Sequence, residues 1–76
     1  MTIKTTSRRI CPGLYAVTAP GVDGEVEVVQ FTRDADGTDY DYWMAKALWD
    51  QYLYSDPCQT KREAMACAVS MLEDRA

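Results

Sequence analysis

The chain has 76 residues, of which 47% are hydrophobic and 26% charged, and its formal net charge is −4. This composition is typical of a folded protein rather than a disordered one, and the length leaves room for a single domain over residues 1–76. No apolar run approaches the roughly 18 residues that a membrane-spanning helix needs.

The chain contains no histidine. It therefore cannot build a Ser-His or Cys-His nucleophile pair, a zinc site that uses histidine, or an imidazole proton shuttle. Carboxylate pairs could still act as acid and base, but they need a desolvated pocket that a domain of this size seldom has. We expect no catalytic residue, no enzyme activity and no cofactor.

The N-terminal stretch MTIKTTSRRICPG has basic residues but no apolar segment after them, so it is not expected to be a signal peptide. A cytoplasmic protein is the corresponding expectation. The three cysteines, Cys11, Cys58 and Cys67, are odd in number and lack CxxC spacing. In a reducing compartment we expect three free thiols.

The first half of the chain predicts strands. Residues 1–10 are polar and form either a flexible tail or an edge strand. After a Pro-Gly turn, residues 14–19 (LYAVTA) favour a strand, and residues 25–33 (EVEVVQFTR) give the clearest strand of the chain. Val29 and Phe31 interrupt the alternation of residues 25–28, which indicates either a β-bulge or a strand with both faces partly covered.

The second half predicts one more strand and two helices. Residues 34–37 (DADG) indicate a hairpin turn, and residues 38–43 (TDYDYW) alternate as a third strand, although they could also begin a helix. Residues 44–54 (MAKALWDQYLY) are good helix formers with apolar residues at helical spacing. Pro57 prevents this helix from continuing.

The last segment carries the strongest local motif. Thr60 and Glu63 match the capping box T-x-x-E, in which the threonine hydroxyl accepts from the Glu63 amide and the carboxylate reaches back to the Thr60 amide. An apolar stripe follows, so residues 61–74 are predicted to be an amphipathic helix. The predicted fold class is α+β, an antiparallel meander of two to three strands packed against two helices.

The acids of residues 34–41 spell D-x-D-G-x-D-x-D, and oxygen-rich loops of this kind can bind calcium. The spacing departs from the EF-hand loop, because the glycine is fourth rather than sixth and the twelfth position is Ala45. We therefore interpret the segment as a solvated turn and expect no metal site.

Negative charge is concentrated in one segment. Between Asp23 and Asp41 there are seven acids and one base, a local net of −6, whereas the remaining residues have seven bases and five acids, a net of +2. An acidic strip repels nucleic acid but attracts a basic protein surface, including one built to hold nucleic acid. The alternative interpretation is a solvated face that confers solubility.

Aromatic residues are concentrated beside the acids. Six of the eight aromatic residues lie within residues 40–54. Tyrosine and tryptophan dominate interaction hot spots, and one helix cannot bury all of these rings on a single face. The residues predicted to bind a partner are Asp34, Asp36, Asp39, Asp41, Tyr40, Tyr42, Trp43 and Trp49.

Two other function classes stay open. A small nucleic-acid-binding regulator would use the basic residues Lys4, Arg8, Arg9, Lys61 and Arg62, although the acidic strip makes direct nucleic-acid binding the weaker alternative. A homo-oligomeric structural protein, such as a homodimer, would bring exposed aromatic rings together across a two-fold axis.

In its short length, acidic balance, lack of histidine and acidic-aromatic segment, the chain resembles the small inhibitors that phages encode against host defence, the anti-CRISPR proteins in particular. The resemblance is one of size, charge and composition. It implies stoichiometric binding to a host protein with a basic surface, such as a nucleic-acid-binding defence complex. The acidic strip of Asp34, Asp36, Asp39 and Asp41 would suit that mode.

Overall fold

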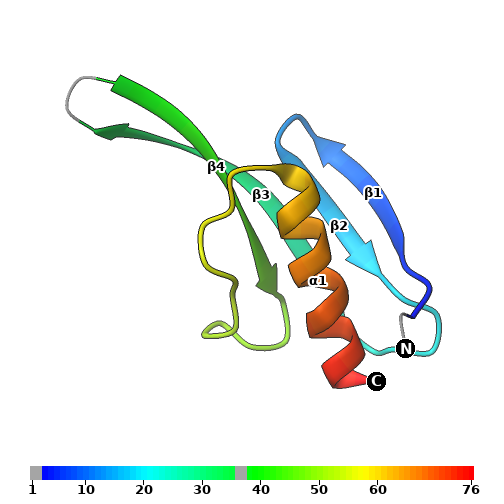
Figure 1. Cartoon of the computed structure of the whole chain (residues 1–76). Coiled ribbons are helices and arrows are strands. Elements are labelled where there is room, and N and C mark those ends of the chain that lie inside the picture. Colours follow the sequence, from blue (N-terminus) through cyan, green and yellow to red (C-terminus); the bar gives the residue numbers. More distant parts are fainter. Residues whose placement is uncertain (1–2, 36–37) are drawn as a thin grey trace.

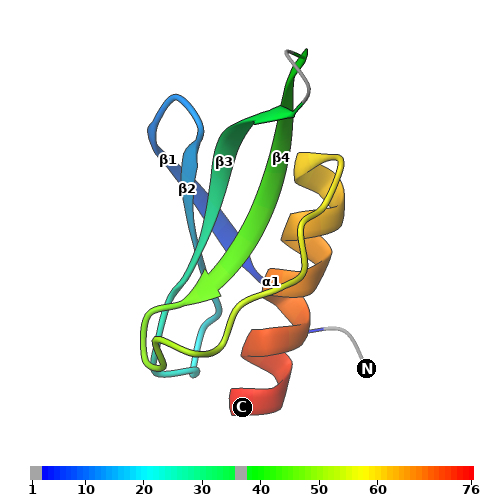
Figure 2. The same ribbon diagram turned by 90° about the vertical axis from the view of Figure 1, so that its left-hand side faces the viewer.

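The computed structural model describes residues 3–35 and 38–76, and the side chains of all of these except residues 33–40. The elements are β1 (Thr6–Cys11), β2 (Leu14–Thr18), β3 (Val26–Ala35), β4 (Thr38–Ala47) and α1 (Lys61–Arg75). The strands form one antiparallel sheet in the order β1-β2-β3-β4, and α1 lies across one face of it (Figures 1 and 2). The α+β class and the antiparallel meander are confirmed, but the described chain has four strands and one helix.

The N-terminal segment is an edge strand rather than a tail. From residue 6 onward it forms β1, which pairs with β2 from Thr6↔Thr18 onward, with an irregularity between Arg9 and Cys11. Pro12 and Gly13 make the connection, and Gly13 has a φ of +82° that suits glycine. All six residues of β1 are exposed.

The strands predicted at residues 14–19 and 25–33 are confirmed as β2 and β3, and the pairing of β3 with both neighbours runs without a register shift. Of the two alternatives, the β-bulge is therefore excluded and the strand with both faces partly covered is confirmed, since Val29 is half-buried. Val26 and Val28 are buried on the side of α1, while Val29 and Phe31 lie on the opposite face. We call that second face, which α1 does not cover, the open face.

The helix predicted over residues 44–54 is wrong. Residues 38–43 are strand, and β4 continues to Ala47. The loop that follows folds back along the outer edge of β4, where the Ala47 and Ser55 amides donate to the carbonyls of Leu53 and Ala45 at 3.0 and 2.8 Å. Trp43 and Cys58 exchange two backbone hydrogen bonds of 2.8 Å. These bonds, and the burial of alternate residues of β4, override the helix propensity of the segment.

Helix α1 is confirmed, one residue longer than predicted. Thr60 is its N-cap, and its hydroxyl accepts from the Glu63 amide at 3.2 Å. The second half of the capping box differs from the expectation, because the threonine hydroxyl also donates to the Glu63 carboxylate at 3.3 Å. Both contacts hold the first turn of the helix in place.

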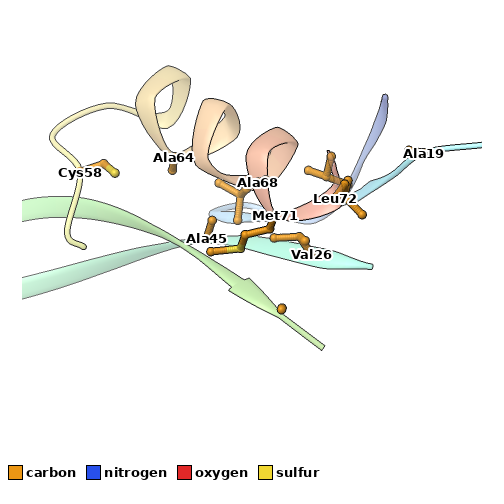
Figure 3. Packing of buried hydrophobic residues seen from close by; sticks show 11 residues of the cluster. Ala19, Val26, Ala45, Cys58, Ala64, Ala68, Met71 and Leu72 are labelled. Atoms are coloured by element: carbon orange, nitrogen blue, oxygen red, sulfur yellow. The ribbon is translucent and has the colours of Figure 1, made fainter. Parts of the chain in front are cut away.

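The core lies between α1 and the sheet and consists mostly of small side chains. Ala64 and Ala68 of α1 point toward the sheet, and they are fully buried, as are Val26 of β3 and Ala45 of β4 (Figure 3). The core cluster comprises Val17, Ala19, Val26, Val28, Ala45, Ala47, Cys58, Ala64, Ala68, Met71 and Leu72.

A second set of contacts fixes the end of α1. The Arg75 guanidinium lies 4.6 Å from the centroid of the Trp49 ring and donates to the Asp23 carbonyl. Gly24 packs directly beneath this ring, so the turn between β2 and β3, the loop after β4 and the end of α1 meet at one point. Within the described residues, no helix has the length and apolar character needed to cross a membrane.

Removing the helix cap should destabilise the protein. We expect Thr60→Ala to lower the free energy of unfolding by about 1 kcal/mol, because the Glu63 amide loses its acceptor. Thr60→Ser keeps the hydroxyl and should retain most of the stability. Chemical denaturation of the two variants tests this, and equal stability of Thr60→Ala and the wild type would contradict the capping role.

The glycine beneath Trp49 should tolerate no side chain. A Cβ at Gly24 would lie 2.6 Å from the Trp49 ring, and its φ of +137° is one that only glycine adopts readily. We expect Gly24→Ala to cost on the order of 1–3 kcal/mol. Gly21 is the matched control, since it also has a positive φ, +80°, but nothing within 4 Å of the added methyl. Thermal unfolding should show the larger loss for Gly24→Ala.

Candidate functional site

The acidic and aromatic segment lies on a two-stranded projection. β2 pairs with β3 only as far as Leu14↔Val29, whereas β3 and β4 remain paired as far as Ala35↔Thr38. Residues 30–35 and 38–43 therefore extend beyond the three-stranded part of the sheet and beyond α1 (Figures 1 and 2). We call this projection the arm.

One face of the arm is aromatic. Phe31 and Tyr42 are partners in the register of β3 and β4, and their rings stack with centroids 5.3 Å apart and an angle of 17° between the planes. Phe31 is 41% exposed even so. This face continues the open face of the sheet, so the stack is accessible to another molecule.

The other face of the arm carries polar groups. Thr32 lies opposite Asp41, and its hydroxyl donates to the Asp41 carboxylate at 2.8 Å. Both residues are exposed. The hydrogen bond orients the carboxylate while leaving it at the surface. Asp41 and Tyr42 thus point to opposite sides of the strand, as their alternation in the sequence predicts.

The other acids predicted for the site belong to the same hairpin. Asp34 and Asp39 are opposite each other in the register of β3 and β4, and Tyr40 is opposite Arg33. The side chains of these residues, and Asp36 as a whole, lie outside the described part of the structure.

The two tryptophans predicted for the site do not join the stacked rings of the arm. Trp43 stands at the base of the arm, where its ring is tilted against Tyr15 with centroids 6.3 Å apart. Trp49 lies at the far end of the molecule, beneath Arg75. Both rings are half-buried against the core, so they contribute mainly to the fold. Tyr52 and Tyr54, in contrast, are 80% and 57% exposed in the loop after β4.

Sequence reasoning missed a hollow beside the arm. It has a volume of about 230 Å³ and lies on the open face, where the loop after β4 returns toward the sheet. Its lining residues are Val29, Phe31, Met44, Lys46, Gln51 and Tyr54. One signal in the sequence could have indicated that this face is apolar. Val29 and Phe31 occupy odd positions of the strand and Val26 and Val28 even ones, so the two pairs point to opposite faces.

The basic residues do not form one patch. The register places Arg8 opposite Ala16 and Arg9 opposite Tyr15, so these two arginines lie on different faces of the sheet. Lys61 lies on the side of α1, with its ammonium 4.2 Å from the centroid of the Tyr15 ring. A continuous nucleic-acid surface would need these charges on one face.

The cysteine and carboxylate side chains are dispersed in the described part of the structure. No group of three or more cysteine, aspartate or glutamate side chains comes together there. The three thiols are unbridged; Cys11 is exposed, Cys58 buried and Cys67 half-buried. Burial raises the pKa of the Cys58 thiol, and the neighbouring Cys67 raises it further. A raised pKa leaves this thiol protonated and weakly nucleophilic at neutral pH.

Comparison with known proteins adds no relative: no family model, curated protein or solved structure matches this chain.

The thiols should differ in reactivity. At pH 8 we expect iodoacetamide to modify Cys11 first and Cys58 last, because alkylation requires an accessible thiolate and both burial and the raised pKa disfavour it at Cys58. Peptide mapping by mass spectrometry over time gives the order. As the pH is raised through the alkaline range, the alkylation rate of Cys58 should be the last of the three to increase. Modification of Cys58 ahead of Cys11 would contradict the buried position.

Proposed function

We propose that this protein is a non-catalytic binding protein that docks the acidic and aromatic arm onto a basic surface of another protein. A nucleic-acid-binding protein is the partner that fits this chemistry best, and an inhibitor of the anti-CRISPR type is the corresponding biological role. The observation that carries the proposal is the projection of the arm beyond both the sheet and α1.

Exposure of the stacked rings supports docking. Phe31 and Tyr42 present a flat apolar surface on one face of the arm, and the hollow beside Phe31 could take one side chain of the partner. Aromatic anchors of this kind contribute most of the binding energy when they become buried, because they have few rotatable bonds. These rings would govern how slowly the complex dissociates.

Charge supports the choice of a basic partner. The chain carries Asp34, Asp36, Asp39 and Asp41 within eight residues that include no base, and Asp41 is exposed. Clustered charge on a projection raises the rate of encounter with a surface of opposite sign, and salt screens this effect. The carboxylates would therefore govern association and the rings dissociation.

The absence of histidine from the sequence and the raised pKa of the buried Cys58 thiol favour a binding role over a catalytic one. The nucleic-acid alternative is less well supported, because Arg8 and Arg9 lie on different faces of the sheet.

Charge reversal in the arm tests the proposal. The immobilised wild type is used to capture a partner from host lysate, and mass spectrometry identifies it. Association and dissociation rates are then measured with the purified partner by biolayer interferometry. We expect Asp36→Lys, Asp39→Lys and Asp41→Lys together to slow association on the order of tenfold or more at low salt. Tyr42→Ala should instead accelerate dissociation.

Two matched variants serve as controls. Asp74→Lys reverses one charge at the exposed end of α1, and Tyr52→Ala removes an exposed ring far from the arm. Both should bind like the wild type. The proposal fails if the triple lysine variant binds the captured partner unchanged. It also fails if the wild-type protein itself retards a DNA fragment at about 150 mM salt, since phosphate binding would then dominate.

A further inference from the structure

β1 is an unprotected edge of the sheet. It pairs with β2 on its inner side, and no other described strand or helix lies along its outer side (Figure 1). Such an edge presents a row of unpaired amide and carbonyl groups that can bind another extended chain. The opposite edge differs, because the loop containing Ser55 and Cys58 forms backbone hydrogen bonds with β4.

Positive charge flanks this edge on both faces. Arg8 lies on the open face and Arg9 on the face of α1, because their partners in β2 are Ala16 and Tyr15. Lys61 adds a third cation on the face of α1, since its ammonium lies over the ring of Tyr15, the residue opposite Arg9 in the register. β1 itself has no acidic residue.

The open-face side of the edge is also hollowed. A space of about 230 Å³ is lined by Thr6, Arg8, Ala16, Thr18 and Glu25. A strand added beside β1 projects alternate side chains to the two faces of the sheet. One set would meet Arg8 and this hollow, and the other set would meet Arg9 and Lys61.

Charge argues against a second copy of the same edge. Two β1 strands paired antiparallel about their centre would place Arg8 of one copy opposite Arg9 of the other. Like charges directly opposite each other in a sheet are destabilising. The cations favour an added strand of opposite charge.

We propose that β1 binds an extended acidic segment of a partner protein, which joins the sheet as a fifth strand. Its main chain pairs with the free edge of β1. Its acidic side chains, at successive positions, alternate between Arg8 on the open face and the pair of Arg9 and Lys61 on the face of α1. This surface is separate from the arm, so the two can be tested independently.

The probe is a fluorescent synthetic peptide of sequence TVDEVDTV, with neutral ends. Two further peptides carry N-methyl groups on alternate amides, one on each edge of the extended chain, and keep the same charge and length. We expect the parent peptide to bind saturably in fluorescence polarisation. One methylated peptide should bind roughly tenfold more weakly and the other should bind like the parent, because only one edge of a strand pairs with β1.

Variants of the protein localise the site. Arg8→Glu combined with Arg9→Glu should weaken peptide binding roughly tenfold, since opposite charges become like charges. Arg62→Glu is the control, because Arg62 is an exposed base on α1 and not on β1. Thermal unfolding verifies that each variant is folded. In the wild type, the peptide should slow amide hydrogen exchange specifically within residues 6–11.

Three results would overturn the proposal. Equal binding by all three peptides would mean that charge alone attracts them. Equally strong competition by an eight-nucleotide oligo-dT would identify a phosphate-binding surface instead. A dimer of the protein alone in sedimentation, with protected amides in β1, would show that a second copy occupies the edge.

Discussion

The close approach of α1 to the sheet is the contact on which the other features depend. Ala64 and Ala68 leave no side-chain bulk between the helix and the strands, and Ala45 and Ala47 provide the matching flat surface on β4. Larger side chains at these positions would lift the helix and open the core. Among the described elements, α1 contacts β2, β3 and β4 but not β1. β1, the open face of the sheet and the far part of the β3–β4 hairpin are therefore left uncovered by the helix, and the two proposed binding surfaces lie among them.

The fold could be predicted wherever a local pattern agreed with the tertiary contacts. The capping box at Thr60 and the alternation in residues 25–28 depend on near neighbours, and both identified their elements. Residues 44–54 could not be assigned this way, because their helix propensity is strong and their actual partners are distant. Ala45 and Ala47 alternate with exposed residues and are buried by α1. The alternation typical of a strand was therefore present, but it was a weaker signal than the many helix-forming residues of the segment.

The candidate site could be predicted in part. The acidic and aromatic segment was found from composition, and Asp41 and Tyr42 occupy opposite faces of one strand as their alternation indicates. The place of Trp49 could not be inferred, since it depends on Arg75 and Gly24, which are distant in sequence. The hollow on the open face also depends on a long-range event, the return of the loop containing Tyr54 toward β3 and β4.

The order of the elements along the chain has a consequence for biosynthesis. Every strand pairs with its neighbour in sequence, so the sheet requires only short loop closures and can form early. The helix that buries the apolar face of the sheet, α1, follows all four strands in the sequence. While the ribosome makes the chain, Val26, Val28 and Ala45 have no cover until residues 61–75 have emerged, and the nascent sheet must avoid aggregation during that interval.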